Sequence, residues 1–218
     1  MTTAATEQPG APSRDRPRHR RRELGEHVAG IVAKLQSRAL REPPHPEAVS
    51  ALARLRRGIG RTPGFDYTLQ DYLWVPDELL GRRPADDTQA TDTEYAVHDA
   101  VTLYALHQQS RRERMHVPGR GLGDALGDLV RAVSGPDGVR RRFAALGTAS
   151  SYAESIYHLR SLTTMLREHQ IPLDYGLLAD DLRTLRRPEY RATIQAKWGR
   201  QFFRARPAQT DAPEETTT

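Results

Sequence analysis

The stretch Thr91-Asp-Thr-Glu-Tyr-Ala-Val-His-Asp-Ala-Val-Thr-Leu-Tyr-Ala-Leu-His107 decides the fold. It begins with the pattern Thr91-x-x-Glu94, in which each side chain can accept a backbone N–H group at the start of a helix. Apolar residues cover most sides of the helix that follows, so this helix is expected to be enclosed at the centre of the molecule. We expect it to run to about Arg114, and other helices must surround it.

Apolar residues recur three or four positions apart on both sides of this stretch, which predicts further helices. They are expected over residues 23–41, 46–58, 122–133, around 143–146, 151–166, 174–185 and from 188 onward, with one or two short helices between 67 and 80. The pair Ser151 and Glu154 forms a second capping pattern, and Asp174 is a candidate cap for the next helix. The last helix carries Tyr190, Ile194, Trp198 and Phe202 on one face, which predicts core packing.

No strand pattern interrupts these helices, so the sequence predicts an all-α protein. We expect a compact helical bundle of about eight or nine helices over residues 23–206. Residues 1–22 hold six arginines and three prolines and are expected to be a disordered Arg-rich N-terminal arm. Residues 207–218 are expected to be a disordered acidic C-terminal tail.

Composition narrows the classes of function. The 218 residues include no cysteine, which excludes disulfides and thiolate chemistry. No apolar run reaches the roughly 18 residues of a membrane span, and the first residues lack the apolar block of a secretory signal. The sequence therefore predicts a cytoplasmic protein without a membrane partner.

Three patterns that could carry enzyme chemistry have simpler interpretations. His98-Asp99 is similar to the central pair of a metal-dependent phosphohydrolase, but His107 lies well away from His98 around the helix, which favours a chance dipeptide. The glycines between 119 and 127 follow no strand, so they indicate a turn and close helix contacts rather than a dinucleotide site. Asp180 and Asp181 are neighbours on a helix and point in different directions. We expect no catalytic residues, no metal and no cofactor.

Arginine placement is more informative. Of the 33 basic residues only Lys34 and Lys197 are lysines, and the net charge is +5. The guanidinium fork of arginine binds phosphate through two hydrogen bonds. Arg56 lies on or beside the apolar side of its helix, where a charge needs a carboxylate or a bound phosphate as its partner. The candidate nucleic-acid-binding residues are Arg56, Arg57, Arg61, Arg120, Arg141, Arg142, Arg160, Lys197 and Arg200.

Simpler explanations of these arginines are solvated helix faces and the codon bias of a GC-rich genome. Several clusters together favour nucleic acid, but the aromatic content of 6% argues against a protein that stacks bases. The residues by themselves therefore predict a helical protein that binds a phosphate backbone without reading bases.

An ordered series of segments resembles the CasB family, the small subunit of the type I-E CRISPR complex Cascade. The segments are 52–58, 104–109, 122–126, 140–143, 158–160, 171–178 and 198–203. The resemblance covers about residues 24–205. It implies an α-helical, non-catalytic protein that is present in two copies and contacts the backbone subunits and the large subunit. It also implies contacts with CRISPR RNA, the target strand and the displaced non-target strand of the R-loop.

Five arginines match basic positions of the CasB family: Arg56, Arg57, Arg141, Arg142 and Arg160. Arg61, Arg120, Lys197 and Arg200 are candidates from their placement alone. Two other classes stay open at this point, a purely structural assembly scaffold and a free-standing helical DNA-binding protein, with an enzyme as the third choice.

Overall fold

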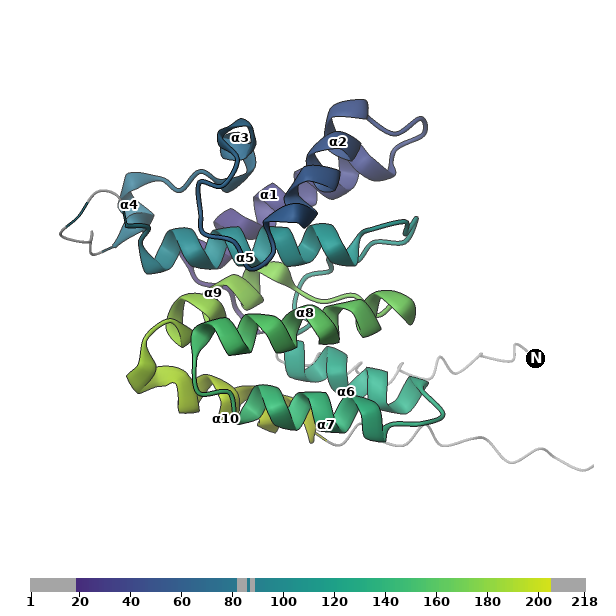
Figure 1. Ribbon diagram of the computed structural model, residues 1–218. Helices are drawn as coiled ribbons and strands as arrows, with labels where there is room; N and C mark the ends of the chain where they lie inside the picture. The colour runs from purple at the N-terminus through teal and green to yellow at the C-terminus, as the bar shows by residue number, and fades with distance from the viewer. Residues whose placement is uncertain (1–18, 82–85, 87–88, 205–218) are drawn as a thin grey trace, which may run out of the picture.

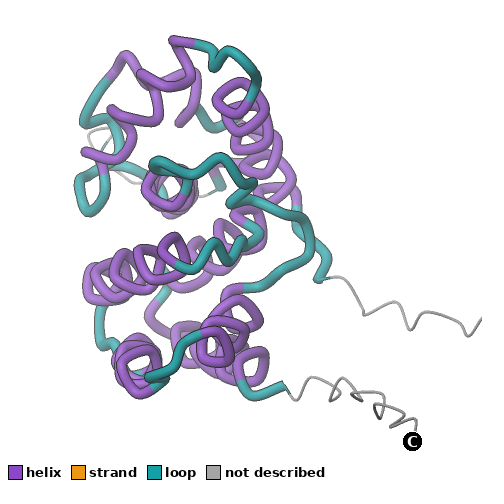
Figure 2. The backbone as a smooth tube through the Cα atoms, turned by 90° about the vertical axis from the view of Figure 1, so that its right-hand side faces the viewer, coloured by secondary structure: helices purple, strands orange, loops and turns teal. Residues whose placement is uncertain are grey.

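The computed structural model describes residues 19–81, 86 and 89–204, and Figure 1 shows their arrangement. The α-helices are α1 (Glu23–Leu40), α2 (Pro46–Leu55), α3 (Gln70–Leu73), α4 (Asp77–Leu80), α5 (Asp92–His107), α6 (Leu122–Ala132), α7 (Asp137–Gly147), α8 (Tyr152–Glu168), α9 (Tyr175–Leu185) and α10 (Arg191–Phe202). The 3-10 helices are η1 (Arg56–Gly58), η2 (Tyr67–Leu69) and η3 (Pro188–Tyr190). The described residues contain no strand, as Figure 2 also shows, so the predicted all-α class is confirmed.

Helix α5 is the enclosed helix that the sequence predicts. It crosses the molecule in Figure 1 between α2 and α3 on one side and α8 and α9 on the other. Thr91 accepts the backbone N–H of Glu94, and Glu94 accepts that of Thr91, so both bonds of the capping box are present. Nearly every side of α5 is buried, because neighbours pack around it from both halves of the chain.

The end of α5 differs from the prediction. The helix stops at His107 rather than near Arg114. Ser110 has a left-handed backbone with φ 56°, which a helix cannot contain. The Gln108 side chain then holds the turn: it donates to the carbonyl of Arg111 at 2.9 Å and accepts the backbone N–H of Met115 at 3.2 Å. The arginines after position 110 therefore lie in a turn beside the end of α5.

In the second half of the chain, the backbones of two helices lie very close together. Helices α6, α7 and α10 form the lower part of the molecule in Figure 1. A Cβ atom built on Gly123 would lie 2.2 Å from the carbonyl oxygen of Trp198 and 2.9 Å from the backbone nitrogen of Phe202. The backbones of α6 and α10 therefore approach closely at a position that only glycine fits, and the predicted role of these glycines in helix contacts is confirmed.

Buried Asp174 joins three segments of the chain. Its carboxylate accepts the backbone N–H groups of Gly176 and Leu177, so it caps α9 as predicted. The same carboxylate accepts a hydrogen bond from Arg21 at 2.9 Å and from the backbone N–H of Gly119 at 2.7 Å. Since several donors share one carboxylate, its buried charge is compensated.

The arm boundary shifts as a result. Residues 19–22, which the sequence analysis assigns to the arm, pack on the body through Arg21 and through Arg22, whose backbone N–H donates to Asp180 at 2.7 Å. The rest of the arm, residues 1–18, and the acidic tail lie outside the described residues.

The predicted apolar face of the last helix is confirmed only in part. Tyr190 is 46% exposed and belongs to η3, since α10 begins only at Arg191, so its predicted place in the core is wrong. Ile194, Trp198 and Phe202 are buried as predicted. Within the described residues, none of the helices combines the length and the apolar character that a membrane crossing requires.

Candidate nucleic-acid interface

Arg56 and Arg57 lie where α2 tightens into η1. Leu52 and Leu55 are buried on the inner face of α2, and η1 packs against α5. Arg56 is consequently half-buried, while Arg57 is exposed. Burial lowers the pKa of Arg56, and the nearby charges of Arg167 and Arg57 lower it further.

Arg56 has no acidic partner in the part of the chain that the structure describes. The sequence left two partners open for a charge at this position, a carboxylate of the protein or a bound phosphate. No described carboxylate forms an ion pair with Arg56 or Arg57. Arg61 is exposed in the turn that follows, where its backbone N–H donates to the carbonyl oxygen of Gly58 at 2.9 Å.

Arg167 is a candidate that the sequence analysis missed. It lies in the last turn of α8 and donates a hydrogen bond to the amide oxygen of Gln109 at 3.0 Å. Arg160 is two turns earlier on the same face of α8, about 10 Å along the helix axis. This spacing was the available signal, but the effect of Arg167 on the pKa of Arg56 depends on how α2 and α8 lie around α5.

Arg142 of α7 contacts α8. The Nε of Arg142 donates a hydrogen bond to the hydroxyl of Ser161 at 3.1 Å, and Ser161 follows Arg160 in the chain. Arg141 and Arg160 are exposed. We call the set Arg142, Arg160, Arg167, Arg56 and Arg57 the α8 track, because two members lie on α8 and Arg142 bonds to it from α7, while Arg56 and Arg57 lie on η1. No ion pair joins a member of the α8 track to a carboxylate among the described residues.

Arg120 and Lys197 differ from the α8 track because each has an acidic partner within the protein. Arg120 forms an ion pair with Asp128. The Nζ of Lys197 lies 2.5 Å from Asp181, which also accepts the indole N–H of Trp198 at 2.8 Å. Burial raises the pKa of Asp181, while Lys197 and Trp198 oppose that shift. These partners compensate the two cations inside the protein.

Arg200 is exposed on α10 and, among the described residues, forms no ion pair. A contact of Arg200, Arg120 or Lys197 with nucleic acid stays a prediction. The structure thus places Arg56, Arg57, Arg142, Arg160 and Arg167 on η1, α7 and α8, whereas Arg120 lies just before α6 and Lys197 and Arg200 lie on α10.

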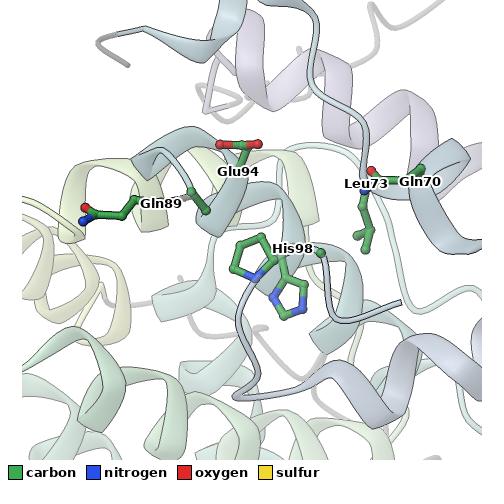
Figure 3. Close-up of a pocket in the computed structure, with 8 residues that line it drawn as sticks. Gln70, Leu73, Gln89, Glu94 and His98 are labelled. Carbon is green, nitrogen blue, oxygen red and sulfur yellow. The ribbon is translucent and has the colours of Figure 1, made fainter. Parts of the chain in front are cut away.

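A pocket of about 200 Å³ lies beside α5 (Figure 3). Its lining consists of Pro63, Gly64, Gln70, Leu73, Gln89, Ala90, Glu94 and His98. The Nδ1 of His98 lies 3.0 Å from Asp99, and the other oxygen of Asp99 accepts the hydroxyl of Tyr152 at 2.7 Å. Glu94 is engaged in the capping box. Within the described chain no group of three potential metal ligands occurs, and the arginines of the α8 track do not line this pocket.

Comparisons with known proteins agree with the resemblance. The family model of the CRISPR-associated protein Cse2 matches residues 51–203. The crystal structure of CasB from Thermobifida fusca is 37% identical, with a TM-score of 0.68, and the alignment covers 84% of this chain and 99% of that one. A chain of a structure described as a CRISPR RNA-guided surveillance complex has the same fold at 21% identity, with a TM-score of 0.59 and coverage of 82% and 95%. No match was found among curated proteins.

The family model spans most of the helical body, and the Thermobifida fusca protein aligns over nearly its whole length. The order of segments that suggested the resemblance is therefore accompanied by a match in sequence and in fold. The chain belongs to the CasB family, whose members are CRISPR-associated Cse2 proteins.

Proposed function

We propose that this protein is a non-catalytic small subunit of a Cascade surveillance complex. In this role it contacts the backbone and large subunits, a second copy of itself, the CRISPR RNA and both DNA strands. It binds the nucleic-acid backbone without sequence specificity and thereby stabilises guide–target pairing and the displaced strand of the R-loop. Membership in the CasB family supports the place in the complex.

The observation that carries the nucleic-acid role is the uncompensated charge of the α8 track. Its five arginines lie on α7, α8 and η1, and no ion pair joins any of them to a carboxylate among the described residues. Arg120 and Lys197 show that this protein pairs other cations internally. Guanidinium groups without a carboxylate partner suit a phosphate backbone. Base pairing with the guide reads the sequence, so the protein needs to follow only charge and shape.

A purely structural scaffold is the second candidate. Tyr67 and Trp74 are 82% and 59% exposed near α3, which suits contacts with other subunits. In this case the basic residues would meet acidic side chains of neighbouring subunits, and loss of the arginines would impair assembly rather than R-loop stability.

The deciding experiment compares two double charge reversals in reconstituted Cascade: Arg56→Glu with Arg57→Glu, and Arg141→Glu with Arg142→Glu. We expect normal assembly and an R-loop that dissociates at least about tenfold faster, because each lost charged hydrogen bond is worth about 1.5–3 kcal/mol. The matched control reverses the exposed residues Lys34 and Arg41 of α1 and its end.

Unchanged R-loop lifetime with intact assembly would exclude the nucleic-acid role for these four arginines. Failure of assembly in the two arginine variants, with the control normal, would instead favour the scaffold.

A further inference from the structure

Tyr157 is a large aromatic side chain on the outer face of α8. Its neighbours Ile156 and Leu159 are buried on the inner face, whereas Tyr157 is 71% exposed. Residues three and four positions apart on a helix are neighbours, with about 5–6 Å between their Cβ atoms, and those that follow Tyr157 at these distances are Arg160 and Ser161. The outer face of α8 therefore carries an open ring and a guanidinium group within one turn.

Arg142 adds a second guanidinium group next to this ring. Its Nε donates to the hydroxyl of Ser161 at 3.1 Å, and a terminal nitrogen donates to the carbonyl oxygen of Gly138 at 3.1 Å. Two neutral acceptors thus hold Arg142 against α8, one turn after Tyr157, where α7 packs beside α8 (Figure 1). Neither Arg142 nor Arg160 forms an ion pair with a carboxylate among the described residues.

The polar groups on the other side of Tyr157 are occupied by one another. Glu154 accepts the backbone N–H and the hydroxyl of Ser150 at 2.8 and 3.0 Å, and it lies 3.8 Å from the Nε2 of His158. The rings of His158 and Tyr157 meet at 74°, with centroids 5.3 Å apart. An edge-on contact covers at most one face of the Tyr157 ring, so another face stays open.

These surroundings suit a nucleotide better than an apolar protein surface. An aromatic side chain that anchors a protein partner usually lies at the centre of a patch depleted of charge. Around Tyr157 the flanking groups are instead two arginines, a serine hydroxyl and a histidine. A nucleotide has the complementary pair of features, a flat base that stacks on a ring and a phosphate that accepts from guanidinium groups.

We infer that Tyr157 stacks on a base of a single-stranded polynucleotide whose flanking phosphates contact Arg142 and Arg160. This inference rests on the proposed function and narrows its ligand. Phosphate contacts alone would serve a duplex equally well, whereas the bases inside a duplex are already stacked on one another. Every base has a π face, so a stacked base adds no sequence specificity, and one ring is consistent with the low aromatic content. Tyr157 is thus the residue that distinguishes a single strand from a duplex.

The test uses the free full-length chain and two labelled oligonucleotides with the same number of phosphates, one of thymidine and one abasic. Wild type is expected to bind the thymidine oligonucleotide about tenfold more tightly, because only this one offers a base to stack. Tyr157→Ala should lose this preference and keep the wild-type affinity for the abasic oligonucleotide and for a DNA duplex. Tyr157→Phe keeps the ring and should retain the preference. Fluorescence anisotropy measures each affinity, and unchanged abasic binding shows that a variant is folded.

Two further variants separate the ring from the charges. Arg160→Gln should weaken binding of both oligonucleotides and make the log–log salt slope about 0.7 less steep, because one phosphate contact is lost. Tyr157→Ala should leave this slope unchanged. The matched control is Tyr190→Ala, which removes an exposed tyrosine of η3 that follows Glu189, and it should bind both oligonucleotides as wild type does.

Several outcomes would overturn the inference. They are equal affinity of wild type for the two oligonucleotides, a preference that Tyr157→Ala retains, and a preference that Tyr157→Phe loses, which would assign the effect to the hydroxyl. Normal oligonucleotide binding by Tyr157→Ala with failed assembly of reconstituted Cascade would make the ring a protein contact. If the arginine reversals shorten the R-loop lifetime while Tyr157→Ala binds as wild type, the proposed function stands and the stacked base falls. If only the base preference depends as expected on Tyr157 and the reversals leave the R-loop unchanged, the stacked base stands and the proposed function falls.

Discussion

At the scale of single residues, His107 is a histidine of the core at the end of α5. The sequence predicts a packed histidine, and the structure confirms it: the side chain is fully buried, and its Nδ1 lies 2.9 Å from the hydroxyl of Tyr175. Burial, helped by the charges of Arg167 and Arg111, lowers the pKa of His107 to about 3, although backbone hydrogen bonds act to raise it. The histidine is therefore neutral at physiological pH and adds no charge beside Arg167 and Arg111.

This neutral state predicts a pH dependence of stability. The unfolded chain binds a proton at His107 below the ordinary pKa of 6.5, whereas the folded chain does not until about pH 3. The contribution of His107 is thus fully present above pH 6.5 and is lost as the pH falls toward 3. We expect the imidazole carbon shifts of His107 in NMR spectra to stay those of a neutral ring from pH 7 to 5. A midpoint near pH 6 would contradict this account.

At the scale of elements, glycine and arginine positions decide what each helix can do. Gly123 lets α6 lie against α10, and the two-turn spacing of Arg160 and Arg167 keeps both cations on one face of α8. Helix α10 contains the contrasting case: a Cβ atom on Gly199 would meet no atom within 4 Å. A side chain is therefore excluded by contact at Gly123, whereas the space around Gly199 would admit one.

The glycine pair gives a stability prediction. Gly123→Ala should destabilise the protein by about 1–3 kcal/mol, because the methyl group overlaps the backbone of α10. Gly199→Ala should stabilise it by about 0.5–1 kcal/mol, because alanine has less backbone freedom to lose in a helix. Urea unfolding of both variants measures the two free energies. Equal effects would show that the close approach of α6 and α10 does not limit stability.

At the scale of the whole molecule, the basic residues differ in whether a carboxylate of the protein neutralises them. The net charge is +5, and arginine occurs in most helices. Around α6, α9 and α10, Arg120 and Lys197 are paired with buried or half-buried aspartates. The arginines of α8 and η1 form no ion pair among the described residues, and the same holds for Arg200 on α10. A polyanion should therefore prefer the arginines that have no carboxylate partner.

The whole-molecule prediction concerns salt. Single-stranded DNA binding by the free chain should weaken linearly on a log–log scale, with a slope of about −0.7 for each phosphate contacted, so about −3 for four phosphates along the α8 track. Affinity should not depend on base sequence, because contacts with phosphate groups carry no sequence information. Fluorescence anisotropy with thymidine and mixed-sequence oligonucleotides measures both. A slope near zero, or protection of a defined DNA site by a dimer, would favour the scaffold or the free-standing DNA-binding protein.

Local features were the predictable part of this fold. The caps at Thr91, Ser151 and Asp174 and the buried face of α5 depend on residues within a few positions of one another, and the structure confirms them. The end of α5 was missed because it depends on the left-handed backbone of Ser110 and on a turn that Gln108 stabilises. The packing of residues 19–22 was missed because their partners lie in α9 and in the residue before it.

The sequence by itself therefore determined the helical class, the order of the helices, the caps and the position of Arg56 beside an apolar face, because helix periodicity and capping act between near neighbours. Only the tertiary structure decided which cations are neutralised. Arg167 meets Gln109 after α5, and Lys197 meets Asp181 of α9, through the packing of helices that are distant in sequence. Coulomb interaction depends on distance in space, and a sequence read along the chain does not contain that distance.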